Sequence, residues 1–407
     1  MKKIVALLLT AAVLMSFYGC RGGREDMTGD DSSVESGARS EEKAALDEVR
    51  KSDLACPDKT VALTEEAARL WLLAGGKLYA VCDSENEISG LSGNEKKLGK
   101  SGVVNAEEVL KLSPDHVLLD DSLPNAKELK EALSNAGIRC EDTTITSFDD
   151  YFSTIKNFCM MTKNAEAYEK AALNVRGRRT AIMRNAADEM PDLRLSLGMK
   201  KSKESGTSGT AGGKESGTER SDNVTFELIR VSADGAAIAS NNDWVCSMLE
   251  DLGLVNLCAE EEPVAVTWKN AEKSRTTASH AAESGTAESS NTESGLSGEE
   301  SAPSEAQNTG TESGANGEQV SSANDREAFA KEIGKNPDFI FVIYCESEKQ
   351  YRKEFEELTD SIRGWNSLKA VKSNHMITLP KESFCTLPND AWDLPMEYLY
   401  QSIFLMG

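Results

Sequence analysis

An alternation of short, apolar, β-rich segments with helical segments constrains the fold more than any other feature, and it occurs twice along the chain. Segments of this kind at this spacing predict βαβ units and mainly parallel sheets. Between the two series, residues 164–190 contain no proline and a single glycine, Gly177. A helix over this stretch would be about 40 Å long. The pattern therefore predicts an α/β fold with two lobes, 55–163 and 191–407, joined by one long helix at 164–190.

The expected elements follow from apolar periodicity and from helix start and stop signals. In the first series we expect strands at 60–64, 77–82, 116–119 and 138–141, and helices at 65–73, 105–112, 126–136 and 147–161. In the second series we expect strands at 193–199, 224–231, 339–344 and 376–379, and helices at 242–252, 326–335, 349–362 and 392–405. A Pro-Asp pair precedes a buried strand in each series, at Pro114-Asp115 and Pro337-Asp338. Because proline cannot continue a helix, two such units indicate two lobes of similar build.

Residues 1–20 have the pattern of an export signal. Lys2 and Lys3 precede an uncharged, mostly apolar run of about 14 residues, which is too short to span a bilayer of about 30 Å. Gly19-Cys20 ends this run and resembles the lipobox of bacterial lipoproteins, in which the cysteine carries the lipid. We therefore expect Cys20 to be the lipidated first residue of the mature chain. The alternative is an ordinary cleaved signal in which Cys20 has no role.

Three segments have too little apolar surface to form a core. Residues 21–54 form a predicted flexible tether, and residues 201–222 and 271–325 are predicted disordered insertions in which a Glu-Ser-Gly unit recurs. Removing the signal and these segments leaves about 280 residues that carry nearly all the aromatic side chains. The remaining core density is ordinary for two α/β lobes.

The charge balance excludes several classes of function. The 407 residues include 68 Asp and Glu against 45 Lys and Arg, for a net charge of −23. This surplus argues against nucleic acid as a partner and against an anionic membrane surface. Only three histidines occur, and the chain has no P-loop, no G-x-S-x-G and no H-E-x-x-H pattern. We therefore expect no enzyme, no resident cofactor and no protein-held metal.

Several motifs in consistent order resemble the helical-backbone class of ABC-transporter substrate-binding lipoproteins, which includes receptors for iron–siderophores, haem and cobalamin. Residues 105–118 (NAEEVLKLSPDHVL) follow that class's helix, Pro-Asp and strand signature, and 336–342 (NPDFIFV) repeat it. The further matching segments are 70–81, 248–257, 365–372 and 388–392.

The resemblance implies a monomer, anchored at the outer face of the membrane only through its lipid, which binds a small chelate between its lobes. Iron–siderophore is the first expectation, with haem and cobalamin behind it, and the partners would be an ABC permease and its ATPase. Glu107 matches the glutamate through which the first lobe docks to permease arginines, although an acidic residue at a helix start is also favourable in itself. In the second lobe the matching position holds Ala330, so Glu327 is the docking candidate there, with Glu332 as the other choice and an ordinary surface charge as the alternative for both. The altered position also supports a rival interpretation, a surface sensing or interaction lipoprotein that keeps the fold without transport.

Candidate ligand-binding residues lie where strands end, because open α/β sheets bind ligands at their carboxyl edge. They are Thr64, Glu65, Asp83, Asn241, Asn242 and Trp244. For Asn242 the alternative is a role as helix cap.

Two further candidates for the ligand cleft come from side-chain chemistry. Arg230 would pair with an anionic chelate and Trp268 would stack on a ligand, with a surface role and a core role as the respective alternatives. Apart from Cys20 the chain has eight cysteines and no C-x-x-C, so the sequence predicts no particular pairing.

Overall fold

The computed structural model describes residues 32–84, 87–100, 103–199, 223–258, 260, 262–268 and 317–405. The chain divides into two units between Ala45 and Leu46, and both sheets described below belong to the second unit. Several predictions concern residues outside the described ranges. They are the signal at 1–20 with Cys20, residues 21–31 of the tether, the insertion at 201–222 and residues 271–316 of the second insertion.

The first sheet is built from five parallel strands in the order β3-β2-β1-β4-β5. The strands are β1 (Thr60–Ala62), β2 (Ala80–Asp83), β3 (Lys96–Lys100), β4 (His116–Leu119) and β5 (Arg139–Asp142). The helices are α3 (Glu65–Leu73), α4 (Ala106–Lys111), α5 (Ala126–Asn135) and α6 (Phe148–Thr162). This body, called the N-terminal lobe below, contains every expected element. Strand β3 is an addition, because its sequence KKLGK has a single aliphatic residue and shows no strand pattern.

The second sheet has the order β11-β10-β6-β7-β9, with β8 paired to β6. Its strands are β6 (Thr225–Val231), β7 (Gly235–Ile238), β8 (Val255–Asn256), β9 (Val264–Thr267), β10 (Phe339–Tyr344) and β11 (Met376–Leu379). The helices are α9 (Trp244–Asp251), α11 (Gly317–Ile333), α12 (Glu348–Ser361), α13 (Lys369–Lys372), α14 (Lys381–Phe384) and α15 (Asp393–Phe404). In this C-terminal lobe the pairs of β6, β10 and β11 are parallel, whereas β7 and β9 add antiparallel edges. The mainly parallel α/β architecture is confirmed, whereas the short strands β7, β8 and β9 of this lobe were not predicted.

The Pro-Asp signature has the same structural role in both lobes. Asp115 accepts hydrogen bonds from the backbone N–H groups of Asp58 and Lys59, at 3.0 and 2.9 Å, immediately before β1. Asp338 accepts from the backbone N–H of Thr225 at 3.0 Å and from its hydroxyl at 2.8 Å, at the start of β6. In each lobe the aspartate that follows the proline therefore binds the start of the central strand. This contact holds β1 beside β4 in the first lobe and β6 beside β10 in the second.

One nearly continuous helical stretch connects the lobes. It consists of α7 (Ala165–Tyr168), a π-helical turn η1 (Glu169–Leu173) and α8 (Asn174–Ser196). The carbonyl of Ala171, within the π turn, accepts a hydrogen bond from the hydroxyl of Tyr151 at 2.6 Å. The expected strand at 193–199 is wrong, since α8 continues for five residues beyond Pro191. Proline has a helical φ, and the lost hydrogen bond together with the clash of its ring with an earlier carbonyl, about 3 kcal/mol, is a cost that this helix tolerates.

Two segments predicted to lack structure are partly helical. Helix α2 (Ser32–Arg50) occupies most of the predicted tether at 21–54, and Val49 is fully buried near its end. Residues 39–50 are rich in strong helix formers, which the compositional argument for a tether left out of account. Likewise, α11 begins at Gly317, inside the predicted insertion at 271–325, because residues 318–333 contain neither glycine nor proline.

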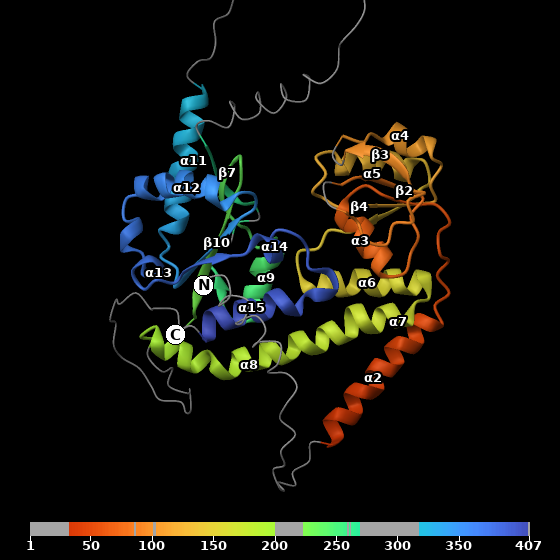
Figure 1. Ribbon diagram of the computed structural model, residues 1–407, viewed down its shortest axis with the longest axis horizontal. Helices are drawn as coiled ribbons and strands as arrows, with labels where there is room; N and C mark the ends of the chain where they lie inside the picture. The colour runs from red at the N-terminus through yellow and green to blue at the C-terminus, as the bar shows by residue number, and fades with distance from the viewer. Residues whose placement is uncertain are drawn as a thin grey trace, which may run out of the picture. The chain divides into compact units, whose positions relative to one another are not determined.

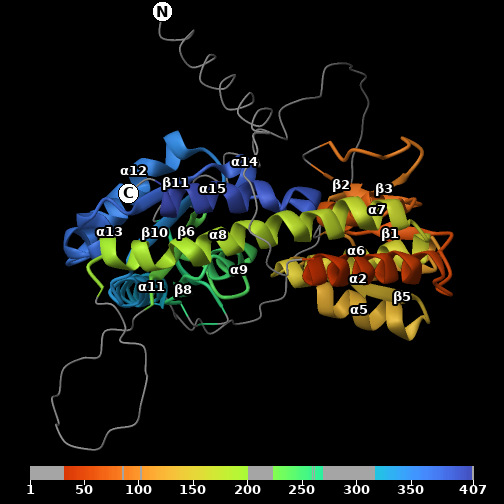
Figure 2. The ribbon, with the colours of Figure 1, turned by 90° about the horizontal axis from the view of Figure 1, so that it is seen from below.

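The C-terminal helix returns to the connecting helix, and Figures 1 and 2 show α15 alongside α8. Arg178 on α8 forms a bidentate ion pair with Asp393 at 2.5 and 3.0 Å. Just before α15, the ring of Trp392 lies 5.7 Å from Phe148 and 5.6 Å from Tyr151 of α6. This buried aromatic cluster binds the C-terminal segment to the N-terminal lobe.

Candidate functional site

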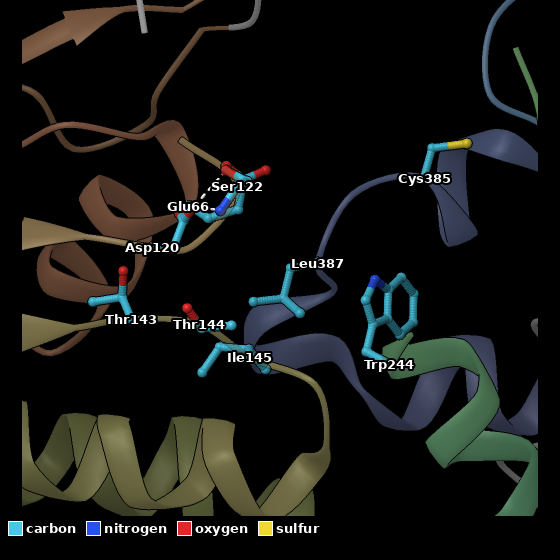
Figure 3. A pocket seen from close by; sticks show the side chains of 9 residues that line it. All are labelled: Glu66, Asp120, Ser122, Thr143, Thr144, Ile145, Trp244, Cys385 and Leu387. Atoms are coloured by element: carbon cyan, nitrogen blue, oxygen red, sulfur yellow. Dashed lines mark hydrogen bonds between the residues drawn. The ribbon is translucent and has the colours of Figure 1, made fainter. Parts of the chain in front are cut away.

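A cavity of about 250 Å³ is lined by residues of both lobes (Figure 3). Its lining consists of Glu66, Asp120, Ser122, Thr143, Thr144, Ile145, Trp244, Cys385 and Leu387. Six of these residues follow β4 or β5 or lie in the first turn of α3, which follows β1. The cavity thus lies at the carboxyl edge of the first sheet, where open α/β sheets bind ligands.

The N-terminal wall of the cavity is rich in acceptor oxygens. Asp120 is almost fully buried and accepts hydrogen bonds from the Thr64 hydroxyl at 2.5 Å and from the Ser122 backbone N–H at 3.0 Å. Its carboxylate therefore has a fixed orientation. Burial, together with the nearby carboxylates of Asp120 and Glu65, raises the pKa of Glu66.

The hydroxyl groups of two threonines in this wall are also held by hydrogen bonds to the protein. The Thr143 hydroxyl donates to the Leu119 carbonyl at 3.1 Å, and the Thr144 hydroxyl donates to the Asp142 carboxylate at 2.6 Å. Each hydroxyl proton is thereby directed toward the protein, which leaves an oxygen lone pair for a ligand. This side of the cavity suits a ligand that carries donors or positive charge.

The C-terminal wall is apolar and flat. Trp244, the first residue of α9, stacks on Phe384 with ring centroids 6.4 Å apart and planes 5° from parallel. Its ring also meets Trp392 edge-on at 5.6 Å, which supports it from a second side. Leu387 projects into the same space (Figure 3). An indole held in this way offers a rigid surface for a planar or apolar part of a ligand.

Of the residues predicted from the first lobe's strand ends, none lines the cavity directly. Thr64 caps α3 and acts on the cavity through its bond to Asp120. Glu65 forms an ion pair with Arg69 at 2.6 Å, and Asp83 is exposed at the end of β2, outside the cavity lining.

Among the candidates from the second lobe, Trp244 lines the cavity. Asn241 is exposed and accepts a hydrogen bond from the Asn256 side chain at 2.9 Å, and the Asn242 backbone N–H donates to the Ser240 hydroxyl at 3.3 Å. The helix cap is Asp243, whose side chain accepts from the Val245 backbone N–H at 2.9 Å.

The two candidates chosen for their side-chain chemistry lie beneath the surface of the second lobe. Arg230, with a side chain 23% exposed, forms a bidentate pair with Asp243. Trp268 packs against the core of the C-terminal lobe and donates from its indole to the Ser232 carbonyl at 2.8 Å. The Arg230 guanidinium is therefore already paired with a carboxylate of its own lobe.

Sequence reasoning missed Asp120, Ser122 and the segment 143–145, although the signal was present. Strand β4 was predicted residue for residue, and β5 was predicted to within one residue. The residues directly after these two strands make up the N-terminal wall except for Glu66, which lies in the first turn of α3 and was also missed. Leu387 and Cys385 had no comparable signal, because they belong to a turn that only the tertiary fold brings to the cavity.

The two predicted docking residues are exposed on helices of different lobes. Glu107 lies in the first turn of α4, beside a capping box formed by Asn105 and Glu108, and Glu327 lies on α11. Within the described ranges, no group of three or more His, Cys, Asp and Glu side chains is placed to hold a metal. No helix in the described part of the chain is long and apolar enough to cross a membrane.

No protein-family model matches the chain, and no curated protein matches it. The solved haem complex of IsdE from S. aureus is 12% identical, with a TM-score of 0.51 over 85% of this chain and 98% of that one. The vitamin B12 binding protein BtuF of Vibrio cholerae is 15% identical, with a TM-score of 0.47 over 86% of this chain and 98% of its own. SirA of Staphylococcus aureus, complexed with staphyloferrin B, is 16% identical, with a TM-score of 0.48 over 86% and 95%. At these identities the similarity to the first structure shows the fold alone, and it is the fold of the class that the motifs resemble.

Proposed function

We propose that this protein is the substrate-binding component of an ABC importer, which captures a metal chelate between its lobes and delivers it to a permease. The cavity carries the proposal, because it is lined from both lobes and lies at the carboxyl ends of β4 and β5. Its volume is near the lower end of small-molecule sites, so a chelate would fill it and extend beyond its mouth. Binding, not catalysis, is the activity that we assign to this cavity.

The lining favours a neutral or cationic chelate over a polyanionic one. None of the nine lining residues is Arg, Lys or His, whereas Glu66 and Asp120 place two carboxyl groups on one wall. Arg230, the cation first considered for this role, is paired with Asp243. A neutral or cationic ferric hydroxamate is therefore our first candidate ligand, with cobalamin behind it. Haem and siderophores of the carboxylate or catecholate type would bring uncompensated negative charge to this wall.

The permanent contacts between the lobes favour small closing motions. The Trp392 cluster and the Arg178–Asp393 pair would both have to be rearranged in a large opening. Disrupting a buried aromatic cluster of this size costs several kcal/mol. This is about as large as the difference in binding free energy between open and closed states that an ordinary ligand can supply. We therefore propose that the receptor binds its ligand with local adjustment of the cavity walls.

Delivery and localisation complete the proposal. Glu107 and Glu327 would each meet a cationic patch of the permease, one from each lobe, and a lipid on Cys20 would hold the protein at the outer membrane face. Both glutamates are exposed, as docking charges must be. An ATPase on another chain would drive transport, since no nucleotide-binding motif occurs here.

Ligand binding is best tested by tryptophan fluorescence on the full chain purified in detergent, because Trp244 lies in the cavity wall. The panel is a cationic ferric trihydroxamate, a neutral one, cobalamin, haem and a ferric tricatecholate. We expect saturable quenching by the trihydroxamates. We expect Glu66→Lys to weaken that binding by about tenfold or more, equivalent to about 1.4 kcal/mol.

Asp83→Lys is the matched control, because it makes the same charge change at the exposed end of β2, outside the cavity lining. Its affinity should equal that of the unmodified protein. Saturable binding of haem or the tricatecholate with no binding of the other chelates would refute the charge argument. No binding by any of the five would refute the receptor proposal, whereas binding without uptake into cells would favour the sensing lipoprotein.

A further inference from the structure

Two cysteines far apart in the sequence meet beside the cavity. Cys345 immediately follows β10, and Cys385 is the C-terminal cap of α14. The side chains of Cys345 and Cys385 interact with each other, and both are half-buried and free of disulfides. Figure 3 shows the Cys385 sulfur turned away from Leu387 and from the opposite wall. Cys385 is thus a lining residue of the cavity whose sulfur faces away from the opposite wall.

A fixed guanidinium connects the two cysteine segments. Nη1 of Arg230 lies 3.9 Å from the Cys345 sulfur and donates to the carbonyl of Phe384, the residue before Cys385, at 3.1 Å. The other nitrogens of this guanidinium bind Asp243, so its position does not depend on the cysteines. The interaction with Cys385, followed by the positive charge of Arg230, lowers the pKa of Cys345 below that of an ordinary thiol. The same interaction with Cys345, together with burial, raises the pKa of Cys385.

We propose that Cys345 and Cys385 are a redox-active dithiol, with Cys345 as the attacking sulfur, Cys385 as the resolving sulfur and Arg230 as the positioning residue. The oxidant is a disulfide-bearing protein or small molecule. The Cys345 thiolate attacks one sulfur of that disulfide, which forms a mixed disulfide and releases the other sulfur as a thiolate. Cys385 then loses its proton and attacks the Cys345 sulfur, which releases the second thiolate of the oxidant. Two thiols of this chain are oxidised to one disulfide, and the oxidant takes up both electrons.

The bond would tie a wall of the cavity to the central sheet. Cys345 directly follows the interior strand β10, whereas Cys385 belongs to the turn that carries Leu387 into the cavity. In the reduced form this turn is held by hydrogen bonds and by the stacking of Phe384 on Trp244. A covalent link would restrict its local opening. This inference does not depend on the identity of the ligand.

The first test is exchange of the reduced full chain, in detergent, with oxidised glutathione, followed by alkylation and peptide mapping without reduction. We expect the Cys345–Cys385 linked peptide as the main intramolecular product, together with slower hydrogen exchange at 381–387. Cys140 is the matched control, because it is also half-buried but burial raises the pKa of its thiol. It should remain free. Free thiols at both positions, or a stable glutathione adduct on Cys345, would overturn the proposal, and unchanged hydrogen exchange in the linked protein would overturn its effect on the turn.

The second test is the pH profile of alkylation of Cys345 by iodoacetamide. Cys385→Ser keeps a hydroxyl donor toward Cys345, so its midpoint should stay well below that of an ordinary thiol, whereas Cys385→Ala should shift it upward. Arg230→Gln should also shift it upward, and Arg230→Lys should restore part of the shift. If the Arg230 variants fail to fold, the two Cys385 variants still decide the result. A single midpoint near that of an ordinary thiol in all of these proteins would exclude the thiolate.

Discussion

A buried carboxyl group in the C-terminal lobe should make the stability of this protein fall as the pH rises. Glu227 lies in the middle of β6 and is 0% exposed. Neither of its carboxylate oxygens accepts a hydrogen bond from any described residue. Lys335, whose charge acts in the opposite direction, is already bound to Glu332 and to the Leu257 carbonyl. Burial, reinforced by the charge of Glu332, raises the pKa of Glu227 from 4.5 to about 8.

The sign of the effect follows from proton binding. Between pH 4.5 and about 8 the folded protein keeps the Glu227 proton while the unfolded chain loses it, so the folded state binds more protons and is destabilised as the pH rises. At about 1.4 kcal/mol per tenfold change in proton affinity, the full effect is about 5 kcal/mol. About 3 kcal/mol of it should develop between pH 5 and pH 8. That is a large share of the stability of an ordinary domain.

The assay is urea unfolding of the unmodified protein and of Glu227→Gln at pH 5 and at pH 8. We expect the free energy of unfolding of the variant, relative to the unmodified protein, to increase by about 3 kcal/mol over this range. Glu357→Gln is the control, because its side chain is 68% exposed on α12 and should give no comparable change. Parallel pH profiles for Glu227→Gln and the unmodified protein would show that this carboxyl group is not desolvated as described.

Three further outcomes follow from packing and docking. Glu107→Lys should abolish uptake in cells while the fluorescence titration shows unchanged ligand affinity, and loss of both would contradict a docking role. Gly76→Ala should lower the free energy of unfolding by about 1–3 kcal/mol, because its Cβ would lie 2.2 Å from the Trp71 ring; a neutral result in urea would refute this close packing. Asp338→Ala should lower the free energy of unfolding in urea by about 1–3 kcal/mol, and Asp115→Ala by about 1 kcal/mol or less, because Asp338 is buried and Asp115 is exposed. A larger loss for Asp115→Ala than for Asp338→Ala would contradict the burial argument.

Much of the fold could be predicted because its causes are local. Strands β4, β10 and β11 match the predicted ranges residue for residue, since each is a short β-rich segment bounded by polar or turn residues. The caps at Asn105 and Ser147 also follow from side chains that bond to the nearest backbone N–H groups. The expected strand at 193–199 was wrong because Pro191 does not end α8. The neighbouring turns of the helix, and not the proline alone, decide where the helix ends.

By itself, the sequence determined the α/β class, the repeated Pro-Asp units and the long connecting helix, because all of these depend on residues within a few positions of one another. Only the tertiary structure decided which side chains share the cavity and what Arg230 is bound to. Asp243 and Cys345 reach that guanidinium from other elements of the lobe, and Cys385 reaches Cys345 through a turn that no periodicity marks. The pairing of charges, the pairing of thiols and the shape of the cavity depend on distances in space. For residues that are far apart in the sequence, the fold sets these distances and the sequence separation does not.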